Sequence, residues 1–106
     1  MKRVAAVIGV SAETVAEYES HHRAVWPGVL ARLRQSHVHN YSIYRSGDTL
    51  FSYYEYTGSD YEADLEAIAS DPETQRWWAL VNPLQRPFDD LPAGVWKELP
   101  ELFHTD

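Results

Sequence analysis

The fold is decided by the segment VHNYSIYRSGDTLFSYYEY, residues 38–56. Its middle, Ser46-Gly47-Asp48, has the composition of a tight hairpin turn. The run from Leu50 to Tyr56 is rich in aromatic residues, which favour strands. The segment therefore predicts a β-hairpin. Strict alternation in its first strand puts one set of side chains on one face, His39, Tyr41, Ile43 and Arg45, and the other set on the opposite face, Val38, Asn40, Ser42 and Tyr44.

Before the hairpin, the pattern predicts one strand and two helices. The apolar run from Val4 to Val10 indicates a buried strand. Ser11 is then the expected N-cap of a helix, because its side chain can accept a hydrogen bond from the first turn. A second helix is expected to start at Pro27, since proline fits the first helical position.

After the hairpin, the same reasoning predicts two more helices and a last strand. Ser59 or Asp60 is the expected cap of the third helix, and Pro72 is expected to start the fourth. Residues 85–92 are expected to form a surface loop. Residues 95–99 alternate as a strand, which Pro100 confines to a sheet edge because proline cannot donate to a ladder.

This order predicts an α+β fold in one domain, residues 1–106. Two strand-helix-strand units around a central hairpin give the ferredoxin-like βαββαβ plan, a four-stranded antiparallel sheet with helices on one face. The other face of such a sheet is bare in a monomer, although the strands carry apolar residues on both faces. We therefore expect two sheets to pack together in a homodimer.

Charge and composition exclude several classes of function. Sixteen acidic residues against nine basic ones give a net charge of −7, which opposes binding to nucleic acid or to an anionic membrane. The chain has no cysteine, so a disulfide framework, a thiolate nucleophile and a cysteine zinc site are all excluded. The first apolar run is too short for a signal peptide and runs directly into a helix. These features are compatible with a cytoplasmic protein, which we expect.

Tyr18 and His22 are the first candidates for chemistry. Four residues apart on a helix, they share one face, and Pro27 indicates that the helix ends soon after them. Imidazole titrates between about pH 5 and 8, so His22 can both accept and donate a proton. His21 points about 100° away and is expected in solvent. A metal site is not expected, because His37 and His39 would share a strand face without a carboxylate to support them.

The aromatic residues provide a second group of candidates. Seven tyrosines, four tryptophans and three phenylalanines are many for a small acidic chain. Tyr41 belongs either to the core or to a site on the helix side. Trp77 and Trp78 diverge by about 100° on a helix, so one is expected in the core and the other in a pocket. Aromatic faces stack on sugar rings, and no hydrolase triad or phosphate loop is present. The residues indicate a sugar-sized aromatic pocket with an imidazole, without naming a reaction.

Four blocks in order match a known pattern: Tyr18-Glu19-Ser20-His21-His22, Val25-Trp26-Pro27, His39-Asn40-Tyr41-Ser42-Ile43-Tyr44 and Gln75-Arg76-Trp77-Trp78. Together they resemble the L-rhamnose mutarotase family. The resemblance implies a dimeric α/β barrel that interconverts the α and β anomers of a 6-deoxy sugar without a cofactor. It also implies that His22 is the proton donor and that the sugar is contacted by Tyr18, Tyr41, Trp77 and Trp78.

The chain departs from the family pattern in two places, at Ile8-Gly9 and over residues 82–92. Both segments are expected to reach the pocket, so L-fucose or another 6-deoxyhexose is an alternative to L-rhamnose. The same dimeric fold also hosts cofactor-free monooxygenases and haem-binding enzymes, which is an analogy of fold alone. A non-catalytic sugar-binding module is the third alternative.

Overall fold

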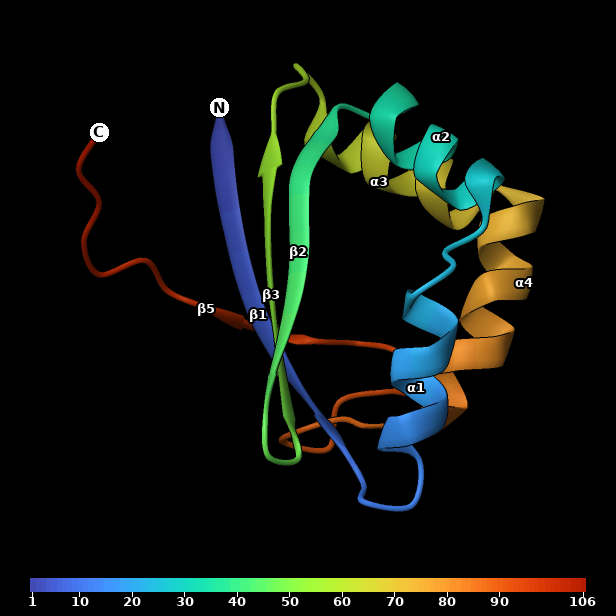
Figure 1. Ribbon diagram of the computed structural model, residues 1–106. Coiled ribbons are helices and arrows are strands. Elements are labelled where there is room, and N and C mark those ends of the chain that lie inside the picture. The colour runs from blue at the N-terminus through green and yellow to red at the C-terminus, as the bar shows by residue number, and fades with distance from the viewer.

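The computed structural model describes residues 1–106 and consists of five strands, four α-helices and one 3-10 helix (Figure 1). In chain order these are β1 (Lys2–Val10), α1 (Val15–His22), α2 (Pro27–Gln35), β2 (Val38–Ser46), β3 (Thr49–Tyr56), α3 (Tyr61–Ala69), α4 (Pro72–Val81), η1 (Asn82–Leu84), β4 (Gln85–Arg86) and β5 (Lys97–Leu99). The predicted α+β class is confirmed. No helix has the length and apolar character needed to cross a bilayer.

The sheet has one more strand than predicted. Its strands pair antiparallel in the order β2-β3-β1-β4, and β5 also pairs with β1. The edge of β1 is therefore shared by two short strands, β4 beside Gly9 and Val10 and β5 beside residues 5–7. The prediction of four strands is wrong because β4, only two residues long, lies within the segment expected to be a loop. Pro87, which cannot donate to a ladder, follows it directly.

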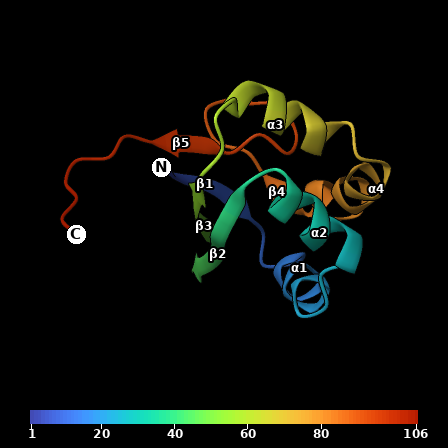
Figure 2. The ribbon, with the colours of Figure 1, turned by 90° about the horizontal axis from the view of Figure 1, so that it is seen from above.

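The four helices lie on one side of the sheet, as two views at right angles agree (Figures 1 and 2). Alternate residues of β1 and β3 face them, among them Ile8 and Leu50, which are fully buried. These side chains form the main core with residues from α1, α2 and α4: Ile8, Val10, Tyr18, Val29, Leu50, Trp77 and Val81. Burial of this apolar surface provides the main stabilisation of the fold.

Two helices begin at side-chain caps as expected, and one expected cap, Ser11, is wrong. The carboxylates of Asp60 and Asp71 accept hydrogen bonds from the backbone N–H groups of Ala63 and Thr74, at 3.2 and 2.9 Å, and so cap α3 and α4. Ser11 is not the N-cap of α1, which begins only at Val15. Ser11 instead closes the preceding turn, because its carbonyl accepts the N–H of Val15 at 3.0 Å.

The hairpin forms where predicted, but its first strand contains a β-bulge. The turn has two residues, Gly47 and Asp48, and Gly47 has the positive φ of 59° that such a turn favours. Between His39 and Ser42 the first strand has one residue more than its partner, and Asn40 has a φ of 50°. The predicted alternation is therefore wrong at this point, because the extra residue reverses the faces that follow it.

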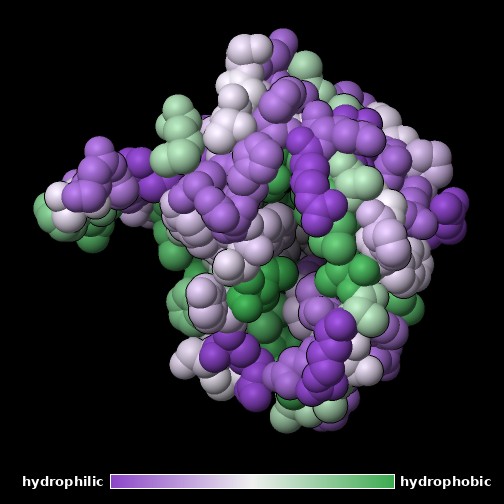
Figure 3. Space-filling model, turned by 45° about the horizontal axis from the view of Figure 1, so that its top comes forward, coloured by the Kyte–Doolittle hydropathy of each residue, from purple (hydrophilic) through white to green (hydrophobic).

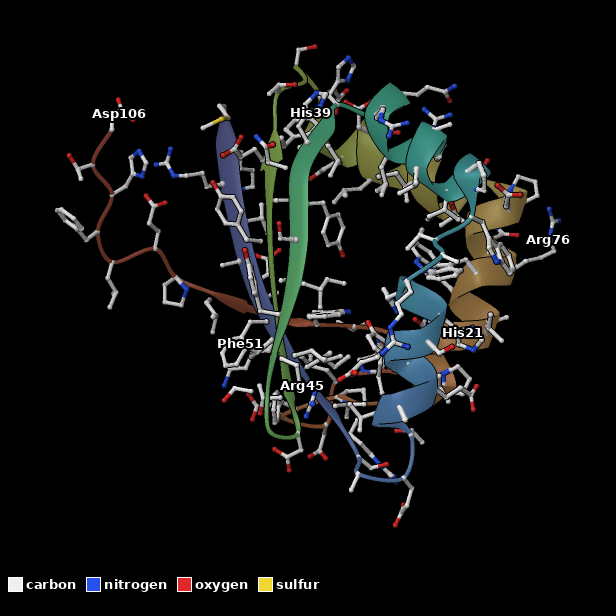
Figure 4. The ribbon with its side chains drawn as sticks, viewed as in Figure 1. His21, His39, Arg45, Phe51, Arg76 and Asp106 are labelled. Atoms are coloured by element: carbon white, nitrogen blue, oxygen red, sulfur yellow. The ribbon has the colours of Figure 1, made fainter.

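The face of the sheet opposite the helices is uncovered. Phe51 projects from it (Figure 4), and both Phe51 and Tyr44 are exposed. Beyond β5 the chain leaves the body of the molecule (Figures 1 and 2), with Leu102 and Phe103 exposed by 94% and 81%.

Candidate active site

A cavity of about 430 Å³ lies between the sheet and the helices. Figure 3 shows hydrophobic side chains gathered around a hollow on this side of the molecule. The lining is mainly apolar and comes from β2, β3 and all four helices. A second hollow of about 280 Å³ lies beside it. His22 and Ile43 line both, so the imidazole stands where the two hollows meet.

Tyr18 and His22 lie together as their spacing predicts. Their rings stack with centroids 4.1 Å apart and planes inclined by 23°. The Nδ1 atom of His22 is 2.8 Å from the backbone carbonyl oxygen of Tyr18. A carbonyl oxygen can only accept, so Nδ1 holds the hydrogen and Nε2 of the neutral ring is a free acceptor. The helix backbone itself therefore fixes the tautomer.

Burial lowers the pKa of His22 from its ordinary value of 6.5. The hydrogen bond to the Tyr18 carbonyl raises this pKa, and the neighbouring His21 lowers it, both less than burial does. At pH 7 the ring is therefore mainly neutral. Trp77 contacts its edge, with ring centroids 5.2 Å apart. The imidazole lies between a phenol and an indole, and its Nε2 is set up to accept a proton.

Tyr18 is held by a residue that the sequence did not indicate. The side-chain amide of Gln85 donates a hydrogen bond to the Tyr18 hydroxyl at 3.2 Å. Burial raises the pKa of Tyr18 and this hydrogen bond lowers it, with burial the larger effect. Gln85 is only 7% exposed and belongs to β4, where it pairs with Val10. The expected surface loop at its position is therefore wrong, and no local pattern in a two-residue strand would have shown it.

The bulge in β2 places Tyr41 in the cavity. Val38, Tyr41 and Ile43 all line it, although strict alternation would separate Val38 from the other two. The residue as a whole is 42% exposed, yet burial of its hydroxyl, with the nearby Tyr18 hydroxyl, raises the pKa of Tyr41 to about 12. The Tyr41 ring also contacts Tyr54, with centroids 5.4 Å apart. Tyr41 is therefore a neutral phenol at the cavity wall.

Trp77 and Trp78 differ in burial as predicted, but both of them line the cavity. Trp77 is 6% exposed and part of the core, whereas Trp78 is 37% exposed. Both line the cavity, so the core tryptophan also forms part of the pocket. Most of the remaining apolar wall comes from α2 and α3, including Leu30, Leu33, Leu65 and Ile68.

The remaining polar candidates lie outside the cavity. His21 bonds Glu17 at 3.2 Å, and Arg76 points away from the sheet (Figure 4). His37 precedes β2 with a φ of 63° and contacts Asp64 at 3.3 Å, so it does not share a strand face with His39. No group of three or more histidine, aspartate or glutamate side chains is placed to hold a metal ion. Of the departures from the family pattern, Ile8 lies in the core and Gly9 lies against β4, where an added Cβ would be 2.7 Å from the Arg86 carbonyl oxygen.

An imidazole, the phenol of Tyr41 and two indoles line an apolar cavity, and Tyr18 lines the adjoining hollow. On a sheet covered by four helices, they define a small α+β protein with a site suited to a sugar ring. Comparison with known proteins agrees. The family model for L-rhamnose mutarotase matches residues 3–105. The chain therefore belongs to the L-rhamnose mutarotase family. This membership confirms the predicted family and the predicted class of enzyme, an isomerase that interconverts sugar anomers.

Individual relatives cover the whole chain. An L-rhamnose mutarotase from Opitutus terrae is 40% identical over 108 residues, covering 100% of both chains. An L-fucose mutarotase from Xanthomonas campestris is 34% identical over 110 residues, covering 97% of this chain and 87% of its own. The crystal structure of an L-rhamnose mutarotase from Formosa agariphila has a TM-score of 0.79 and 21% identity over 100% of both chains. This structural likeness supports the fold.

Proposed function

We propose that the protein interconverts the α and β anomers of L-rhamnose by general acid–base catalysis at His22. The observation that supports this best is the position of the imidazole. Nε2 is a free acceptor, because Nδ1 is bonded to the Tyr18 carbonyl, and the ring stands where two hollows meet. A neutral imidazole at such a place can take a proton from one substrate oxygen and give it to another.

The reaction needs one proton to move between two oxygens of the sugar. Ring opening removes the proton from the anomeric hydroxyl and adds one to the ring oxygen, while the bond from the anomeric carbon to the ring oxygen breaks. In our proposal, Nε2 of His22 accepts the first proton, and the resulting imidazolium donates it to the ring oxygen. Rotation of the free aldehyde and the reverse transfers close the ring on the other face. The proton count is unchanged, so no cofactor is required.

The remaining site residues bind and orient the sugar in this proposal. Tyr18 and Tyr41 present hydroxyls that their raised pKa values keep protonated at neutral pH, so both can donate hydrogen bonds. Trp77 and Trp78 provide flat apolar surfaces for the sugar ring. Leu65 and Ile68 provide an apolar wall that suits the methyl group of a 6-deoxy sugar and offers no hydrogen-bond partner to a hydroxyl on carbon 6.

The substrate is tested by measuring anomer exchange with NMR saturation transfer on L-rhamnose and L-fucose side by side. We expect exchange to be faster with L-rhamnose, because the L-rhamnose mutarotase from Opitutus terrae is 40% identical to this chain and the L-fucose mutarotase from Xanthomonas campestris is 34% identical. Faster exchange with L-fucose would instead identify L-fucose as the substrate, as in the relative from Xanthomonas campestris. Saturable binding without exchange would show a sugar-binding module. A Soret band on haem titration would favour the haem-binding alternative.

We propose further that two copies form a homodimer through the uncovered face of the sheet, as a dimeric α/β barrel. Exposed apolar side chains on this face, among them Tyr44, Phe51 and Leu99, support this proposal. So does the extended end of the chain, whose Leu102 and Phe103 contact no core of their own. Large exposed apolar patches on small proteins mark interaction surfaces.

We also propose the ferredoxin-like plan, with β4 and β5 together in place of a single fourth strand. The order β2-β3-β1-β4 supports it. The absence of cysteine supports a reducing, cytoplasmic location.

A further inference from the structure

Gln85 has an unusual place for a polar side chain. It is buried under the sheet edge in β4, next to Val10 of β1. Its Nε2 donates to the Tyr18 hydroxyl, and its Oε1 has no hydrogen-bond partner. A buried acceptor without a partner destabilises the folded state. Packing therefore does not explain the amide, and an apolar side chain of the same size would be better for stability.

The contact with Gln85 decides what the Tyr18 hydroxyl can do. A phenol has one hydrogen to donate, and its oxygen accepts. The Gln85 amide occupies the accepting side, and no protein group accepts the Tyr18 hydrogen. Tyr18 also lines the second hollow together with His22. The hydrogen is thus free to point to an oxygen of a molecule bound beside the imidazole.

We infer that Gln85 is a positioning residue that turns the Tyr18 hydroxyl into a hydrogen-bond donor toward the sugar. This inference rests on the proposed function and deepens it, since it names a residue on a distant strand that acts through Tyr18. It also assigns different tasks to the two stacked rings. His22 accepts through Nε2, and Tyr18 donates through its hydroxyl, so a sugar can receive both contacts at once.

The test is a double-mutant cycle on KM for L-rhamnose, measured from the concentration dependence of anomer exchange. Gln85→Leu removes the donor, and Tyr18→Phe removes the hydroxyl. We expect each single variant to raise KM about tenfold, the size of one hydrogen bond. The double variant should be no worse than Tyr18→Phe alone, because Gln85 acts only through that hydroxyl. Losses that multiply, or a wild-type KM in Gln85→Leu, would overturn the inference.

Two further variants separate positioning from folding. Gln85→Leu should keep or raise the melting temperature while KM rises, whereas a merely structural role predicts a lower melting temperature. Gln85→Glu puts a carboxylate acceptor against Tyr18, takes the phenol hydrogen and should raise KM more than Gln85→Leu does. An equal or smaller effect would contradict the direction of the hydrogen bond. Gln35→Leu, at the exposed end of α2, is the matched control and should leave KM and melting temperature unchanged.

Failure of the proposed function gives a different result. In that case the wild-type protein shows no exchange with any sugar. The same four-protein cycle is then measured by calorimetric titration of L-rhamnose. Non-additive losses of affinity would support the role of Gln85 in binding, and additive losses or unchanged affinity would reject it.

Discussion

The two faces of the sheet differ in how the chain covers them. On the inner face, Ile8 and Leu50 are buried under four helices. On the outer face, Phe51 and Tyr44 are exposed although they are as apolar as many core residues. Both faces come from the same strands, since side chains alternate along each strand. The difference shows that one apolar face is closed within the chain and the other is left exposed.

The comparison also shows why the site lies where it does. On the inner face the helices do not close completely on the sheet, and they leave the cavity of about 430 Å³. His22 stands at its margin, half-buried, rather than in the core or in solvent. This position lowers its pKa while keeping Nε2 accessible. We therefore propose catalysis on the inner face and dimer formation on the outer face, and each proposal can be tested separately.

The largest effect is expected from His22→Ala on the inner face. Loss of the group that moves the proton should slow catalysed anomer exchange of L-rhamnose by about 10² to 10⁴. The melting temperature should change little, because the ring is only half-buried. NMR saturation transfer measures the rate.

His21→Ala is the matched control, since this neighbouring ring bonds Glu17 at the surface. It should retain nearly the full rate. If His22→Ala exchanges as fast as the wild type, the assignment of His22 is wrong.

Next in size is the contrast between the two tryptophans on the inner face. Trp77→Ala should lower the free energy of unfolding by about 3–5 kcal/mol, because it leaves a cavity in the core. Trp78→Ala should cost less stability, since Trp78 is more than a third exposed, and should mainly weaken sugar binding. Urea unfolding and calorimetric titration distinguish the two. Equal destabilisation by the two substitutions would contradict the prediction, because it would mean that Trp78 belongs to the core as Trp77 does.

On the outer face, Phe51→Glu should prevent two copies from packing. A charge at the centre of an apolar interface is costly to bury, so the molecular mass in light scattering should fall to that of one chain. Anomer exchange per chain should persist, since Phe51 does not line the cavity. Ala16→Glu on the exposed side of α1 is the control and should leave the mass unchanged. A wild type that is already monomeric would refute the dimer.

The smallest effect concerns pH and tests the free Nε2 of His22. Since the pKa of His22 is lowered below 6.5, the neutral base dominates at pH 7. The catalysed rate should therefore be flat at and above neutral pH and fall about tenfold per unit once the pH drops below that pKa. Exchange rates corrected for the uncatalysed reaction provide the profile. A rate that instead falls as pH rises through neutrality would show that the protonated ring starts the reaction.

Much of the site followed from local spacing. Tyr18 and His22 share a face because helix geometry brings residues four apart together, and the rings are stacked as that rule requires. The division of Trp77 from Trp78 followed in the same way. Gln85 could not be found by such rules, since its partner Tyr18 is 67 residues away in the chain. Its two-residue strand is too short to have a period.

The amino-acid sequence by itself determined the order of the four helices and the first three strands, the hairpin turn, the net charge and the helical pair of phenol and imidazole. These depend on neighbours within a few residues, where backbone sterics and side-chain spacing act directly. Only the tertiary structure decided that a bulge at Asn40 turns Tyr41 toward the helices and that β4 brings Gln85 to Tyr18. It also decided that burial lowers the pKa of His22. Register, long-range contacts and burial depend on how distant segments pack, and a local pattern does not record them.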